Sequence, residues 1–469
     1  MKVKQLTSWT LTLLIISAID NVRNLPQIAL FGTTLIFYCL LSAFIFLIPV
    51  ALISAQLSSA NRKEGESGGI YRWTCLAFGP RVGMMAIWLQ WINTLVWFPT
   101  ILSFIAAVAA YFFNPELATN KTYLVTVTLA VFWGMTLLNL FGIERSASLA
   151  TLFSTLGTLA SIALIIVFSF LWILLGKPTE LHFHCANLLP SFHGANYFSS
   201  LTAITAIMTS LLGVELATVH INEVKNPEHS FPRALLLAVI VILVSMILGS
   251  LGIALVLPAH QISLVDGVMQ IFTVFTKTYH LTFLLPMIVL MILLGCLSSM
   301  IGYIISPAKG ILEAAEHGYL PSFLRMQNRH GVPARLLLAQ ALIVSLLCSA
   351  WGLMPSVNGS YWLLTDLSTQ LYVLMYVFMF LAALKLKAHT PYTPHRFNIP
   401  GGFLGTVLTC SLGLLGTLMT LLIGFIPPSN IDVGTPLHYF LIFSTGMVVM
   451  IFPVLGCYAY QSFSSSKNR

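Results

Sequence analysis

The stretch Ser17–Pro26 reads SAIDNVRNLP and interrupts an apolar run that extends from about residue 9 to 30. Two ionisable side chains, Asp20 and Arg23, lie inside this run, where a charge surrounded by lipid would cost several kcal/mol. Asp and Asn side chains compete with the hydrogen bonds of a helical backbone, and Pro26 removes one such bond. The stretch therefore predicts a helix that is broken near its middle.

The composition of the whole chain explains why this run belongs in a membrane. Hydrophobic residues make up 58% of the 469 residues and only 8% are charged, whereas about 25% of a soluble domain is charged. A soluble fold could not hide so much apolar surface, because every folded protein keeps a large exposed surface. Composition thus argues against a soluble protein and predicts an all-α membrane protein.

The apolar windows predict twelve transmembrane helices, because each has roughly the 20 residues that a spanning helix needs. They lie near residues 9–30, 33–57, 83–113, 122–142, 147–175, 197–219, 234–257, 281–306, 336–355, 361–384, 402–426 and 436–460. The polar stretches between them are too short to fold alone. Residues 1–469 are therefore predicted to form a single transmembrane domain.

The distribution of basic residues predicts the orientation. Of the 22 Lys and Arg residues, only Lys121, Lys177 and Lys277 fall in one set of alternate loops, and Arg23 lies in the membrane. All others fall in the opposite loops and tails, and cytoplasmic loops carry the excess of positive charge. Both termini are therefore predicted to be cytoplasmic.

No basic cluster with interleaved aromatic residues indicates nucleic acid, and the seven scattered cysteines without a C-x-x-C pair predict no metal site.

A second interruption surrounds Glu215 in the sixth window, where Gly213–Leu216 reads GVEL and Gly213 weakens the helix. It lies five segments after the first break, in a helix that runs the opposite way. Two discontinuous helices at corresponding positions of inverted halves indicate a transporter binding site. Freed N–H groups at a half-helix start attract a carboxylate, and freed carbonyls at a half-helix end attract an ammonium group. The pair of breaks therefore suits a zwitterionic amino acid.

The same residues allow other interpretations. Asp20 and Arg23 could neutralise each other as a buried pair instead of contacting a substrate. Glu215 could be a structural link or a proton carrier, and a gating or coupling role is favoured. Asp366, in the tenth window, is predicted to lie at the outer interface.

Three motifs resemble a known family over nearly the whole chain. They are ESGGIY at 66–71, GVE at 213–215 with NP at 226–227, and SPAKG at 306–310 with LP at 320–321. Together they resemble the amino acid–polyamine–organocation (APC) superfamily. The chain most resembles the bacterial glutamate/GABA antiporters, through VMQ at 268–270, RFNIPGG at 396–402 and PPSN at 427–430.

The resemblance implies a LeuT-like fold, with inverted five-helix repeats at about 9–175 and 197–384 and two added helices at about 402–460. It implies a secondary transporter in a bacterial inner membrane, not an enzyme, and an amino-acid antiporter that works by alternating access. A proton-coupled amino-acid permease and a non-transporting amino-acid sensor are the alternatives. The implied partners are an amino-acid substrate and the lipid bilayer, with protons and a second copy of the chain as open candidates. No cofactor and no nucleic acid is implied.

The resemblance also places the candidate site residues at the two breaks and on the eighth segment. The candidate substrate-binding residues are Ile19, Asp20, Asn21, Arg23, Gly213, Val214, Glu215, Leu216, Ser299 and Tyr303. Glu215, Asp20 and Tyr303 are also candidates for proton coupling or gating.

Two departures from the family pattern concern specificity. The first break of the superfamily is often glycine-rich or made of small residues, whereas here it carries Asp20 and Arg23. Ser299 stands where the glutamate antiporters carry an acidic residue on the eighth segment, so glutamate/GABA specificity does not follow from the resemblance.

Overall fold

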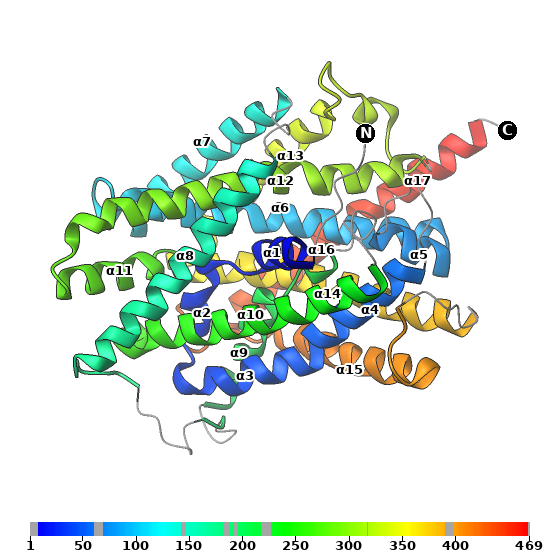
Figure 1. Ribbon diagram of the computed structural model, residues 1–469. Helices are drawn as coiled ribbons and strands as arrows, with labels where there is room; N and C mark the ends of the chain where they lie inside the picture. Colours follow the sequence, from blue (N-terminus) through cyan, green and yellow to red (C-terminus); the bar gives the residue numbers. More distant parts are fainter. Residues whose placement is uncertain are drawn as a thin grey trace.

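The computed structural model describes residues 8–60, 69–141, 147–181, 188–190, 196–216, 227–316, 318–389 and 397–467. Within these ranges the secondary structure is entirely helical. Figure 1 shows the long helices lying side by side in one bundle. Part of the motif at 66–71 and residues 217–226, which follow the second break, lie outside the described residues.

Ten helices in the described ranges are long and apolar enough to cross a membrane. One is the span Gly32–Ser59, built from α3 (Leu35–Ser42), a π-helical turn at Ala43–Leu47 and α4 (Ile48–Ala60). Seven are the single helices α6 (Pro80–Ala110), α7 (Lys121–Leu140), α8 (Ala147–Leu174), α10 (Pro227–Val256), α12 (Leu285–Glu316), α14 (Val357–His389) and α15 (Gly402–Ile423). The remaining two are α13 (Ala334–Leu347) with a 3₁₀ turn to Gly352, and α16 (Pro436–Ile451) with α17 (Pro453–Lys467).

The first and sixth of the twelve predicted segments are the two missing from these ten. The first consists of α1 (Ser8–Ile19), a 3₁₀ turn at Val22–Asn24 and the short α2 (Leu25–Ala29). The sixth is α9 (Asn196–Ser210), which belongs to a short apolar helical stretch ending at Leu216. The two interruptions are therefore confirmed. Two further helices, α5 (Ile70–Phe78) and α11 (Gly267–Thr278), are too short to span.

Local chemistry ends α1 where the sequence predicts. The last helical bond of α1 runs from the Asp20 N–H to the Ile16 carbonyl, at 2.8 Å. Asn21 is extended, and its side-chain oxygen accepts a hydrogen bond from the Arg23 N–H at 3.2 Å, which caps the 3₁₀ turn. Pro26 stands in the first turn of α2, where a missing N–H costs nothing.

The second break depends on a glycine. Gly213 has φ +103°, a conformation that residues with a Cβ rarely adopt. Its N–H donates to the hydroxyl of Tyr376 on α14, at 2.9 Å. The backbone donor that leaves the helix is thus satisfied by a tyrosine, as a buried polar group requires.

The outer face of the bundle keeps large apolar side chains exposed. Leu346 is 72% exposed, Leu422 75% and Phe463 77%. In water such residues would form an unfavourable apolar surface, whereas in a bilayer they contact acyl chains. The polar and charged groups described next lie inside the bundle instead.

Candidate functional site

Arg23 lies in the 3₁₀ turn of the first break and reaches α6 and α14. The side chain is 2% exposed. Its Nη1 donates to Thr100 Oγ1 on α6 at 2.8 Å and to the Tyr361 hydroxyl on α14 at 3.2 Å. The guanidinium carbon lies 4.8 Å from the ring centroid of Trp97, a distance that suits a cation–π contact. Three neutral side chains on two long helices therefore hold this cation.

The charge of Arg23 is not balanced by any acidic side chain in the described part of the chain. Its contacts are a hydroxyl, a phenol and an indole, and its Nε is buried without a hydrogen-bond partner. A buried charge is costly unless it is paired. The guanidinium can therefore receive an anion, and a carboxylate matches its planar geometry well.

Asp20 faces the other side of the same break. It is 3% exposed, and its Oδ2 accepts a hydrogen bond from Ser245 Oγ on α10 at 2.6 Å. Its Oδ1 is buried without a hydrogen-bond partner. Asp20 thus faces α10, whereas Arg23 faces α6 and α14. The interpretation that the two residues neutralise each other is therefore wrong.

Glu215 is held between the second break, α14 and α6. The hydroxyls of Tyr372 and Tyr376, both on α14, donate to its carboxylate, and Gln90 Nε2 on α6 lies 3.5 Å from its Oε1. The Tyr376 hydroxyl also accepts a hydrogen bond from the Gly213 N–H. One tyrosine therefore connects the backbone of the break with the carboxylate of Glu215.

Tyr303 of α12 connects the surroundings of the two breaks. Its ring centroid lies 5.0 Å from that of Trp97, the residue stacked on Arg23. Tyr303 is also an electrostatic neighbour of Arg23 and of Tyr372. The structure therefore brings Arg23, Tyr303 and Glu215 around one region lined by α6, α12 and α14.

The other predicted site residues have different surroundings. Ile19 and Val214 are buried apolar residues, Leu216 is half-buried, and Asn21 caps the turn that carries Arg23. The Ser299 hydroxyl donates to the carbonyls of Gly295 and Cys296 in its own helix. The hydrogen bonds of Ser299 thus stay within α12 and do not link this residue to Arg23 or Glu215.

The residues that bind the two charged side chains are not predicted from the sequence, although the spacing of tyrosines in α14 indicates some of them. Tyr361, Tyr372 and Tyr376 are 11 and 4 residues apart, a spacing that places all three on one face of a helix. Their hydroxyls serve Arg23 and Glu215. The partners Gln90, Trp97 and Thr100 on α6 are 7 and 3 residues apart and likewise lie on one face of their helix.

The prediction that Asp366 lies at the outer interface is wrong. The residue is buried, and its carboxylate accepts hydrogen bonds from Gln370 Nε2 at 2.9 Å and from the Tyr439 hydroxyl at 2.7 Å. Tyr439 comes from α16, which covers this part of α14. Asp366 therefore links α14 to α16 inside the bundle.

The family follows from comparison with known proteins. A family model described as amino acid permease matches residues 6–453. The chain belongs to this amino acid permease family. Membership of the APC superfamily, predicted from the motifs, is thereby confirmed. The permease is a multi-pass integral membrane protein and a secondary transporter of amino acids or polyamines, not an enzyme.

Several relatives match the permease over most of both chains. An uncharacterized transporter of Legionella pneumophila is 36% identical over 449 residues, covering 96% of this chain and 95% of that protein. A glutamate/gamma-aminobutyrate antiporter of Lactococcus lactis is 29% identical over 442 residues, covering 92% and 86%. A probable agmatine/putrescine antiporter of the same species is 26% identical over 419 residues, covering 88% and 84%.

Solved structures support the fold. The crystal structure of a mutant manganese transporter of Eremococcus coleocola superposes with a TM-score of 0.56, covering 97% of the permease and 94% of that chain. At 13% identity this similarity concerns the fold alone. The predicted LeuT-like fold is confirmed.

Proposed function

We propose that the permease is an amino-acid antiporter that works by alternating access and binds the substrate carboxylate at Arg23. The observation that carries this proposal is the buried guanidinium, which contacts only neutral side chains in the described structure and keeps an unpartnered Nε. An incoming carboxylate would supply the missing negative charge and a bidentate partner. A substrate without a carboxylate would leave the charge of Arg23 unbalanced.

The substrate ammonium group would meet the second break. The helix that contains α9 ends near Gly213, and carbonyl groups at a helix end carry partial negative charge. Glu215 lies in the same turn, but the hydroxyls of Tyr372 and Tyr376 already bind its carboxylate. We therefore assign the ammonium group to backbone carbonyls of the break, and assign Glu215 and Tyr303 to gating or coupling.

Exchange, rather than uptake alone, is supported by the relatives. Two of them are named as antiporters, one of glutamate and gamma-aminobutyrate and one, probable, of agmatine and putrescine. The proposal includes movement of two inverted repeats, at about 9–175 and 197–384, around the site. It also includes a bacterial inner membrane and cytoplasmic termini. A proton-coupled amino-acid permease is the alternative.

Flux into reconstituted vesicles tests this function. Liposomes containing the purified permease are loaded with unlabelled amino acids, and uptake of a labelled panel is measured at acidic and neutral external pH. Exchange predicts uptake that requires a loaded lumen. Uptake into empty vesicles driven by external acid would indicate proton-coupled import, and no uptake by folded protein would contradict transport of amino acids.

Variants of Arg23 test the carboxylate contact in the same vesicles. Arg23→Gln removes the charge and is expected to weaken substrate binding at least about tenfold, because a charge-assisted contact contributes about 1.5–3 kcal/mol. Arg23→Lys keeps the charge but loses the planar fork, so its binding should be intermediate. Unchanged affinity in a well-folded Arg23→Gln protein would refute this contact.

A further inference from the structure

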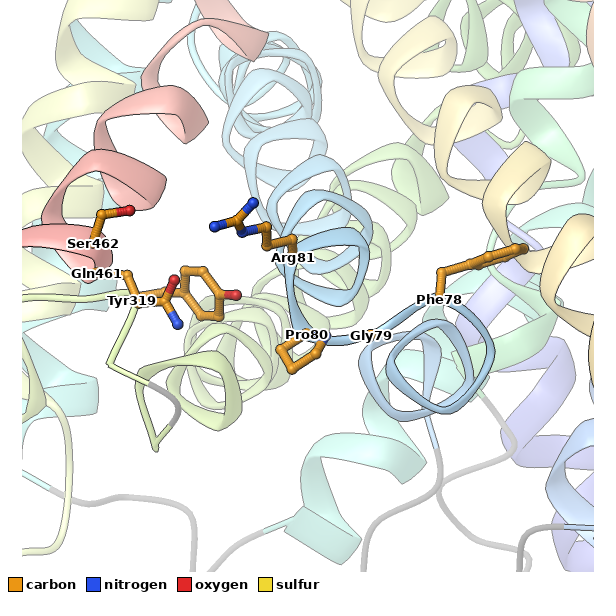
Figure 2. A pocket seen from close by; sticks show the side chains of 7 residues that line it. All are labelled: Phe78, Gly79, Pro80, Arg81, Tyr319, Gln461 and Ser462. Carbon is orange, nitrogen blue, oxygen red and sulfur yellow. The ribbon is translucent and has the colours of Figure 1, made fainter. Parts of the chain in front are cut away.

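An open pocket of about 510 Å³ lies where α5, α6 and α17 meet. Figure 2 shows its lining, to which Arg81 of α6, Tyr319 of the segment after α12, and Gln461 and Ser462 of α17 contribute polar side chains. None of these residues takes part in the site at the two breaks. The pocket is therefore a separate feature of the permease.

The pocket has the chemistry of an anion site. Arg81 is the one charged side chain among the described residues that line the pocket, and Figure 2 shows its guanidinium extending toward α17. The Arg81 carbonyl accepts a hydrogen bond from the Tyr458 hydroxyl at 2.9 Å, which fixes the backbone of this residue against α17. Among the residues that the structure describes, no acidic side chain contributes to the lining. The guanidinium of Arg81 suits an anion with several oxygen acceptors, such as a phosphate group.

The surroundings of the pocket point to a lipid as the source of that phosphate. Phe463, next to Ser462 on α17, is 77% exposed, and Tyr460 is 38% exposed. On the α5 side, Lys385 lies 4.9 Å from the ring centroid of the lining residue Phe78. Exposed aromatic side chains of α17 thus lie beside the polar pocket, and a second cation contacts one of its lining residues. An acyl chain and a headgroup phosphate of one molecule could occupy both surfaces.

We propose that this pocket binds the phosphate group of an anionic phospholipid, with Arg81 as its charged contact. The positive-inside pattern assigns Arg81 to the cytoplasmic side, and basic pockets between transmembrane helices on that side bind anionic headgroups. A lipid bound there contacts α6, the central helix of the substrate site, and α17, the last helix of the described chain. Soluble phosphate offers the same chemistry without the acyl chains.

Binding to the purified full-length permease tests this assignment. The protein is delipidated in detergent, and native mass spectrometry measures bound phosphatidylglycerol and phosphatidylcholine. Phosphatidylglycerol should bind about fivefold more tightly, the factor that one basic residue near an anionic lipid contributes. Arg81→Gln should lower this preference to less than about twofold, while Arg81→Lys should retain most of it.

Controls separate the pocket from general charge effects. Arg329→Gln removes an exposed arginine of the loop before α13 and should keep the full preference. Should Arg81→Gln fail to fold, Gln461→Ala changes the same pocket and should reduce binding. An equal lipid preference in folded Arg81→Gln and the unmodified protein would overturn the proposal. Inorganic phosphate that competes fully with the lipid and binds equally well would overturn the assignment to a lipid.

Discussion

Arg23 and Asp20 are three residues apart, yet the break turns them toward different helices. Arg23 meets hydroxyl and aromatic groups of α6 and α14, and Asp20 meets Ser245 of α10. A continuous helix would have placed residues i and i+3 on one face. The interruption therefore lets one short stretch present a cation to the candidate site and an anion to a neighbouring helix.

Glu215 offers a test of coupling at the level of a single residue. If its carboxyl group exchanges a proton during transport, Glu215→Gln should flatten the pH dependence of uptake, because the amide cannot titrate in this range. The amide oxygen can still accept a hydrogen bond from Tyr372 or Tyr376, so a folded protein is expected. Uptake by proteoliposomes measured from pH 5 to 8 provides the profile.

The matched control for Glu215 is Glu116→Gln, since Glu116 is exposed in the 3₁₀ turn after α6. This variant should retain the profile of the unmodified permease. An unchanged profile in Glu215→Gln would restrict Glu215 to a structural link between the second break and α14.

At the level of helices, the sequence predicts the breaks because their causes are local. An Asp-Asn pair ends α1 and Pro26 stands in the first turn of α2, and a glycine with positive φ interrupts the second helix. The partners of the charges are determined by packing between distant segments. Thr100 is 77 residues from Arg23, and Tyr361 is 338 residues away. The prediction for Asp366 is wrong for the same reason, because its partner Tyr439 lies on another helix.

The contact between α8 and α12 depends on two glycines. A Cβ added at Gly295 would lie 2.8 Å from the Gly157 Cα, closer than real Cβ contacts allow. Gly295→Ala should therefore separate the helices and destabilise the permease by about 1–3 kcal/mol, the usual cost of overpacking. Thermal unfolding in detergent would show this as a lower Tm. Because α12 carries Tyr303, slower uptake should accompany it.

Gly134→Ala is the control for this packing effect. A Cβ at Gly134 on α7 would meet no atom within 4 Å, and alanine stabilises a helix relative to glycine by about 0.5–1 kcal/mol. Its Tm should stay the same or rise. If Gly295→Ala behaved like Gly134→Ala, close contact between α8 and α12 would not be needed for stability.

At the scale of the whole molecule, apolar composition predicts the membrane fold, and polar links inside the bundle connect its parts. Tyr111, directly after α6, donates a hydrogen bond to Asp266 Oδ2 at 2.8 Å. Asp266 precedes the short helix α11 and is buried, with its Oδ1 unpartnered. This single side chain thus connects the start of α11 with the end of α6.

The stability of the permease should depend on pH through Asp266. Burial raises the pKa of this carboxyl group above its ordinary value of 3.8, although hydrogen bonds from Ser263 and Tyr111 oppose the shift. The folded state then binds the proton more tightly than the unfolded state, so the stabilisation is complete below pH 3.8 and is lost as pH rises through the raised pKa. Asp266→Asn, which resembles the protonated form, should raise the Tm near neutral pH and change it little in acid. Glu180 is exposed, so the control variant Glu180→Gln should show neither effect. The prediction would be contradicted if the Tm of Asp266→Asn differed from that of the unmodified protein by the same amount at every pH, because Asp266 would then not titrate with folding.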